Sequence, residues 1–106
     1  MSKRMKRLAP VHPGEILRED YMKPLNITPT ALARALRMDA PAVLAIASGK
    51  RAISARTALR LARYFDTTPE FWLNLQARCE LELADRECGS VIEAEVTPIA
   101  MAARAR

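Results

Sequence analysis

The chain has 106 residues, half of them apolar and only three of them glycine, which is enough for one domain with one modest core. No apolar run approaches the roughly 18 residues of a membrane span, and the basic N-terminus lacks the apolar segment of a signal peptide, so we expect a cytoplasmic protein. The formal net charge of +5 favours an anionic partner such as nucleic acid, although many basic proteins have no such partner.

The first eleven residues form a basic N-terminal arm. Residues 2–7, SKRMKR, carry four basic side chains in six positions. Two interpretations remain open for them: a solvated tail, or an arm that lies along nucleic-acid phosphates or enters a minor groove. Residues 8–11 are expected to be extended, because Pro10 and Pro13 each disfavour helix in the preceding residue.

A first helix is predicted from Pro13, since proline fits the first helical position and Glu15 can reach back to free backbone N–H groups. It should stop before Pro24. His12 then lies near the N-cap. We interpret it as structural rather than catalytic, because no serine, cysteine or second histidine lies nearby.

Residues 28–51 predict two short helices joined by a tight turn. Thr28 is a good N-cap for the first helix, Asp39 caps the second, and Gly49 is well placed to end it. Helices this short cannot bury a core alone, so they need packed flanks on both sides. The small residue Ala33 at the point of closest approach is typical of a helix-turn-helix.

The second helix of the pair is almost free of polar side chains. Val43 and Ile46 lie three apart on one face and should point inward. The outward positions are then Ala40, Pro41, Ala42, Leu44 and Ala45. None of these can make a bidentate bond to guanine or adenine, which leaves contact with thymine methyls, readout of DNA shape, and phosphate binding.

Basic side chains follow this helix directly. Lys50 and Arg51 lie in the next loop and are the best phosphate-contact candidates, with a merely basic loop as the alternative. Arg56 stands near the start of a predicted helix over residues 55–65, in a row with Arg60 and Arg63 that can equally be a solvated stripe. The candidate DNA contacts are Thr28, Thr30, Arg37, Ala40, Ala42, Ala45, Ser48, Lys50, Arg51 and Arg56.

The last predicted helix begins at Pro69, runs to about Glu87 and ends near Gly89. Its apolar stripe is wider than one small domain needs, which predicts a homodimer interface near Phe71, Trp72 and Leu75; core packing is the alternative role for Trp72. Cys79 and Cys88 point to opposite sides of this helix, so we expect no disulfide. No metal site or other cofactor is expected, because the chain has one histidine and no CxxC spacing.

Residues 90–99 alternate apolar and acidic side chains, which favours a short strand. A lone strand is unstable, so it would pair with residues 8–11 or with another protomer.

Taken together, these pieces resemble the HigA/VapI-type antitoxins, a branch of the XRE-like helix-turn-helix regulators. The matching pieces are HPGEILRED at 12–20, ALARAL at 31–36, SGKRAIS at 48–54, TALRLARYF at 57–65 and TTPEFWLNLQ at 67–76. The resemblance implies an all-α, five-helix lambda-repressor-like domain over residues 12–89, between the arm at 1–11 and a C-terminal extension at 90–106.

The resemblance also implies a function. It implies a DNA-binding regulator that dimerises, represses its own operon, and binds and neutralises a partner toxin, an mRNA-cleaving endoribonuclease. The alternative is a protein-interaction module that has kept the fold and lost base reading, which the apolar outer face of residues 40–47 favours. We do not expect an enzyme, because no acid–base or nucleophile constellation is present.

Overall fold

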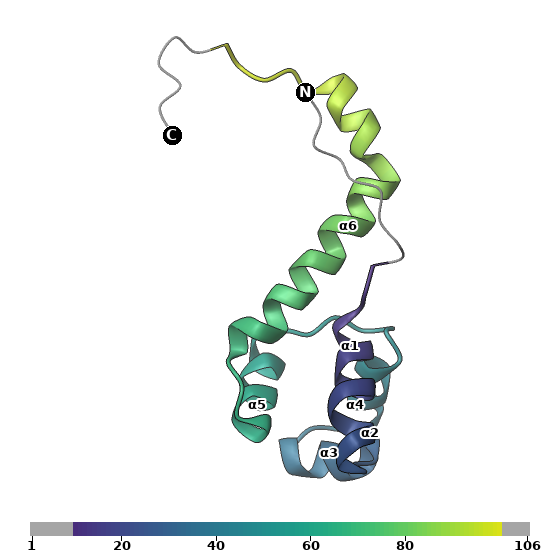
Figure 1. Cartoon of the computed structure of the whole chain (residues 1–106), viewed down its shortest axis with the longest axis vertical. Helices are drawn as coiled ribbons and strands as arrows, with labels where there is room; N and C mark the ends of the chain where they lie inside the picture. The colour runs from purple at the N-terminus through teal and green to yellow at the C-terminus, as the bar shows by residue number, and fades with distance from the viewer. Residues whose placement is uncertain (1–9, 101–106) are drawn as a thin grey trace.

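The computed structural model describes residues 10–100, and all regular structure in that range is helical (Figure 1). Three segments follow one another without a break and form one continuous first helix. These are α1 (Pro13–Ile16), the π-helical η1 (Leu17–Met22) and α2 (Lys23–Leu25). The others are α3 (Pro29–Leu36), α4 (Ala40–Ala47), α5 (Ala55–Phe65) and α6 (Pro69–Glu95). The prediction of a five-helix, all-α fold is therefore confirmed.

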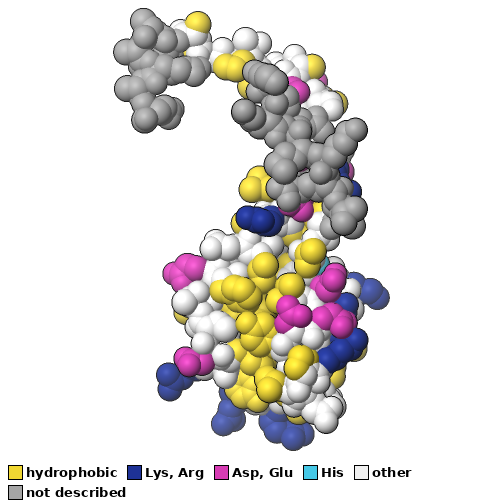
Figure 2. Space-filling model, viewed as in Figure 1, with side chains coloured by type: hydrophobic (Ala, Val, Ile, Leu, Met, Phe, Trp, Pro, Cys, Tyr) yellow, Lys and Arg dark blue, Asp and Glu magenta, His cyan; other side chains and the backbone are white. Residues whose placement is uncertain are grey.

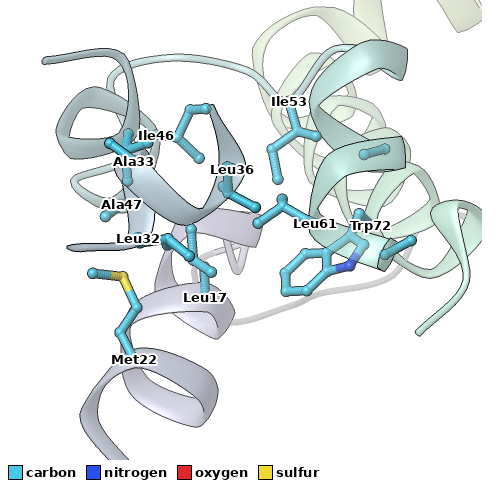
Figure 3. Close-up of a cluster of buried hydrophobic side chains, with 13 residues drawn as sticks. Leu17, Met22, Leu32, Ala33, Leu36, Ile46, Ala47, Ile53, Leu61 and Trp72 are labelled. Atoms are coloured by element: carbon cyan, nitrogen blue, oxygen red, sulfur yellow. The ribbon is translucent and has the colours of Figure 1, made fainter. Parts of the chain in front are cut away.

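Every one of these five helices contributes to a single core (Figure 3). The fully buried side chains include Leu17, Leu32, Ile46, Leu61 and Trp72. Burying an aliphatic or aromatic side chain of this size contributes about 1.5–3 kcal/mol each. The short helices α3 and α4, which could not persist alone, are therefore held by the packing that the other helices supply.

The helix starts follow the local sequence signals. Hydroxyl side chains accept backbone N–H groups three residues along, at 3.1 Å for Thr28, 3.2 Å for Ser54 and 3.1 Å for Thr68. Asp39 does occupy the position before α4, but its side chain makes no capping hydrogen bond. Asp39 therefore stands at the predicted N-cap position but does not cap the helix through its side chain.

The first helix passes through Pro24 and ends at Leu25, so the predicted stop before Pro24 is wrong. The N–H of Lys23 donates to the carbonyl of Arg18, five residues earlier, as in a π-helix. That wider turn relieves the clash between a proline ring and the carbonyl four residues before it. The C-cap of this helix is Asn26, which adopts a left-handed conformation with φ of 59°.

The predicted strand over residues 90–99 is also wrong, because α6 continues through Gly89 to Glu95. Glycine inside a helix costs only about 1 kcal/mol relative to alanine, so it does not by itself stop a helix. Of the proposed intramolecular partner, residues 8–11, the described Pro10 and Val11 belong to no strand. Residues 8 and 9 lie outside the described residues. The outer half of α6 extends away from the helical body (Figure 1).

Candidate nucleic-acid interface

The turn between α3 and α4 has the geometry of a helix-turn-helix. Arg37 adopts the left-handed conformation, with φ of 59°, and the N–H of Met38 donates to the carbonyl of Ala33 at 2.8 Å. Ala33 is buried where the two helices meet. From α5, the guanidinium of Arg60 donates to the carbonyl of Leu36 at 2.8 Å and so satisfies the end of α3.

The exposed face of α4 is apolar, as predicted. Val43 and Ile46 are buried, whereas Leu44 is 56% exposed. Ala40, Ala42 and Ala45 are partly buried, and they leave Leu44 as the largest side chain directed away from the core on this helix. Leu44 is absent from the sequence-based list of candidate contacts, although its size makes it the dominant feature of this face.

A surface hollow of about 390 Å³ lies between the first helix, the start of α3 and the end of α4. It brings together Thr28 and Ser48, two of the predicted contacts that are twenty positions apart in the chain. It also contains three polar residues that sequence reasoning missed: Arg18, Lys23 and Asn26. Lys23 and Asn26 lie five and two positions before the cap Thr28, and this nearness in sequence is the one signal that could have indicated them.

The basic loop after α4 is fixed at both ends. At its start, the guanidinium of Arg18 donates to the carbonyl of Ala47, and Gly49 follows with φ of +80°. At its end, the buried N–H of Ile53 donates to Oε1 of Gln76 at 2.9 Å. Between these points the candidate phosphate contacts Lys50 and Arg51 are exposed.

His12 is a structural cap, as predicted. Its Nδ1 accepts the N–H of Gly14 at 2.8 Å. Burial lowers the pKa of His12, and the negative charge of Glu80 opposes that shift. Gly14 itself lies against α4: a Cβ at this position would be only 1.8 Å from the carbonyl oxygen of Ile46. The HPGE sequence therefore serves the close packing of the first helix on α4.

Other predicted DNA contacts lie apart from the 390 Å³ hollow that contains Thr28 and Ser48. Arg37 falls at the far end of α3 from Thr28 and Thr30, beside Arg60 and Arg63 at a second hollow of about 480 Å³. Arg56 is exposed in the first turn of α5, directly after the basic loop. The structure therefore brings Thr28 and Ser48 together and leaves Arg37 in a different surface region.

The predicted dimer contacts differ in their exposure. Trp72 has no exposed surface and donates through Nε1 to Oγ1 of Thr67 at 2.8 Å, so its assignment to an interface is wrong and it is a core residue. Phe71 is 36% exposed and stacks edge-on against Trp72, while Leu75 is partly buried. Apolar side chains gather in a band on the body between α1 and α5 (Figure 2). Phe71 and Leu75 stay predicted contacts.

Two further features of the described residues concern metal binding and membrane crossing. Within residues 10–100, no cluster of three or more histidine, cysteine or acidic side chains is placed to hold a metal ion. In the same range, no helix combines the length and apolar character needed to cross a membrane.

Comparison with known proteins identifies the family to which this chain belongs. The sequence profile of the helix-turn-helix family matches residues 19–72, from the middle of the first helix to the start of α6. Virulence-associated protein I of Dichelobacter nodosus is 43% identical over 81 residues, covering 76% of this chain and 75% of that protein. The chain belongs to the helix-turn-helix family.

Solved structures of this family agree with the fold. The antitoxin HigA of Pseudomonas aeruginosa, solved with the higBA promoter, has a TM-score of 0.84 and 48% identity, over 86% of this chain and 99% of that one. The antitoxin GraA in complex with its operator has a TM-score of 0.85 and 42% identity, over 92% of this chain and 100% of that one. The HigA-type resemblance inferred from the five sequence pieces is thereby confirmed.

Proposed function

We propose that this chain is a cytoplasmic, homodimeric repressor that binds the operator of its own operon and neutralises a toxin that cleaves mRNA. The observation that carries the DNA-binding part is the fixed basic loop beside α4. Lys50 and Arg51 are exposed, while the loop that bears them is anchored by Arg18 at one end and Gln76 at the other. A loop fixed in this way presents its charges to phosphates with little loss of conformational freedom on binding.

Phosphate contacts supply most of the affinity in this proposal. Thr28 and Thr30, exposed at the start of α3, lie at a helix terminus whose N–H groups favour an anion. The P. aeruginosa HigA structure with promoter DNA and the GraA structure with its operator support this use of the fold. Binding that rests on phosphates should be strongly salt-dependent and only modestly sequence-dependent.

The partner toxin and the dimer rest on the family resemblance and on the exposed apolar surface of the chain. Phe71 and Leu75 are the contacts we propose for the dimer. Replacing Phe71 with glutamate should then give a monomer by light scattering, whereas Leu25→Glu, at another exposed apolar residue, should leave the dimer intact. A wild-type chain that scatters as a monomer at micromolar concentration would contradict the dimer.

The second candidate function is a protein-interaction module without base reading. The apolar face of α4 and the adjacent 390 Å³ hollow favour it, because exposed apolar surface often marks an interface. The two functions differ in their response to DNA. A module of this kind would bind its own promoter no better than it binds a scrambled duplex, and removal of the loop charges would leave its protein partner bound.

A titration of the promoter and of scrambled DNA at two salt concentrations tests the proposal. The double variant Lys50→Ala with Arg51→Ala should weaken binding on both sequences and reduce the salt slope by up to about two. The control is Arg63→Ala with Arg78→Ala, which removes the same charge from exposed sites away from the loop. Equal losses in the two double variants would show that only net charge matters, and would refute the loop contacts.

A further inference from the structure

Charge is divided unevenly along this chain. Residues 80–95, the outer half of α6, carry six acidic side chains against the single Arg86, a net charge of −5. The acidic residues are Glu80, Glu82, Asp85, Glu87, Glu93 and Glu95. The chain as a whole has a net charge of +5, so this acidic helix stands in contrast to the basic remainder.

The same half of α6 is also apolar on its surface. Leu81 is 71% exposed, Val91 is 51% exposed and Ile92 is 50% exposed. Leu81 and Ile92 are eleven residues apart, three turns of helix, and therefore share one face. Because this part of α6 extends beyond the body, the other described helices do not cover it (Figure 1). A surface that is both acidic and apolar suits a basic segment with apolar side chains.

The chain carries such a segment at its N-terminus, directly before the described residues. Residues 1–9 contain four basic side chains, together with the apolar residues Met1, Met5 and Leu8. The segment leads into His12, on which the charge of Glu80 acts. Nine extended residues reach at most about 30 Å, and residues 80–95 span about 22 Å, so the segment can cover the whole acidic stretch.

We propose that the outer half of α6 is the docking surface for the chain's own basic residues 1–9, and that it competes with DNA for them. A second copy of α6 is a poorer occupant, because each copy brings the same net charge of −5. The competition with DNA rests on the proposed function, whereas the docking does not. Bound to α6, the four cations cannot contact phosphates, so the segment adds to DNA affinity only after it has left the helix.

Nuclear magnetic resonance of the full chain tests the docking directly. Wild type is compared with a variant in which Lys3, Arg4, Lys6 and Arg7 are all glutamine. Amide resonances of residues 80–95 should shift between the two proteins, and about 0.5 M salt should reproduce the shifts in wild type, since exposed ion pairs are screened. Shifts confined to residues 10–16 or to α3 and α4 would overturn the proposal. Shifts that grow with protein concentration would place the segment on a second copy and overturn it equally.

Affinity for promoter DNA tests the competition. One variant combines Glu82→Gln, Asp85→Asn and Glu87→Gln; the control combines Glu15→Gln, Asp20→Asn and Glu70→Gln, which removes as much charge from the exposed body. The α6 variant should bind roughly threefold to tenfold more tightly than the control, because each exposed ion pair contributes little. This difference in affinity between the α6 variant and its control should vanish when residues 3, 4, 6 and 7 are also glutamine. A difference that persists in that background would refute the competition. A chain that binds no DNA would refute the proposed function and leave the resonance test of docking standing.

Discussion

Gln76 on α6 accepts the buried backbone N–H of Ile53 at 2.9 Å and donates to Oε2 of Glu80 at 2.8 Å. One side chain thus joins the end of the basic loop to the base of the acidic outer half of α6. Gln76 is only 8% exposed, so water cannot readily replace it as a partner. The loop that carries Lys50 and Arg51 depends on this hydrogen bond for its position.

Replacing Gln76 with alanine should lower the free energy of unfolding by about 1–3 kcal/mol, because the N–H of Ile53 would remain buried without an acceptor. Urea denaturation followed by circular dichroism measures this loss. Asn74→Ala is the control, since Asn74 is an exposed amide on the same helix and its replacement should change stability by less than about 0.5 kcal/mol. Equal urea midpoints for the two variants would contradict the role assigned to Gln76.

Replacing Gly14 with alanine should cost about 1–3 kcal/mol of stability, and more if the first helix must shift as a unit. The reason is steric: the added Cβ would lie 1.8 Å from the backbone oxygen of Ile46, which cannot rotate away. Thermal unfolding gives the measurement. Gly89→Ala adds the same methyl group to the interior of α6, where helix propensity favours alanine by about 1 kcal/mol, and it should not lower Tm.

The close approach at Gly14 illustrates what the sequence could not supply. Helix starts were predictable because their signals are local: a proline follows a hydroxyl residue at Thr28 and Thr68, and the cap needs only those neighbours. The contact of Gly14 with Ile46, and that of Arg18 with Ala47, joins residues about thirty positions apart. Only the packed fold determines such pairs.

The two errors in secondary structure have a similar origin. Pro24 and the alternating residues of 90–99 carry strong local preferences, which are a proline's tendency to end helices and the strand tendency of β-branched side chains. In the structure neither local preference decides the backbone conformation. A π-helical turn accommodates Pro24, and the absence of a paired strand in the described range leaves residues 90–95 to continue the helix. The sequence leaves Trp72 open between an interface and the core, because its sequence neighbourhood cannot reveal that the other helices enclose it completely.

The stability of the fold should depend on pH through His12. Its Nδ1 accepts the N–H of Gly14, and protonation would turn that acceptor into a donor and break the cap. Burial lowers the pKa of His12 in the folded chain, only partly offset by Glu80, so folding favours the neutral imidazole. Its contribution to stability is complete above the ordinary histidine pKa of about 6.5 and is lost as the pH falls below that value toward the lowered pKa.

Thermal unfolding at pH 7.5 and pH 5.5 would measure this dependence. His12→Asn is the matched variant, because asparagine caps a helix without titrating. Between the two pH values wild type should lose about 2–4 °C more in Tm than His12→Asn, which corresponds to a fraction of a kcal/mol in a domain of this size. Carboxyl groups titrate alike in both proteins and cancel in the comparison. Parallel losses in Tm would show that His12 does not contribute.

The apolar surface of α4 limits the sequence preference that the chain can have for DNA. Leu44 is 56% exposed and is flanked by the partly buried Ala42 and Ala45, so this face offers a methyl-rich surface and no hydrogen-bonding side chain. Such a surface favours the C5-methyl group of thymine. In a symmetric dimer the two α4 helices would lie about 34–36 Å apart, and the operator should be an inverted repeat with half-sites about 10 base pairs apart that contain thymine.

Selection of bound sequences from a random DNA pool tests this preference. Leu44→Ala should weaken the thymine preference, whereas Leu59→Ala, at a leucine of similar exposure on α5, should leave it unchanged. Ala42→Asn should either leave binding unchanged or create a new preference for adenine, since asparagine can form the bidentate bond that alanine cannot. A G-rich consensus with no thymine at the half-site centre would contradict the readout by Leu44. A promoter preference above roughly a thousandfold would likewise show that α4 reads bases by more than methyl contact.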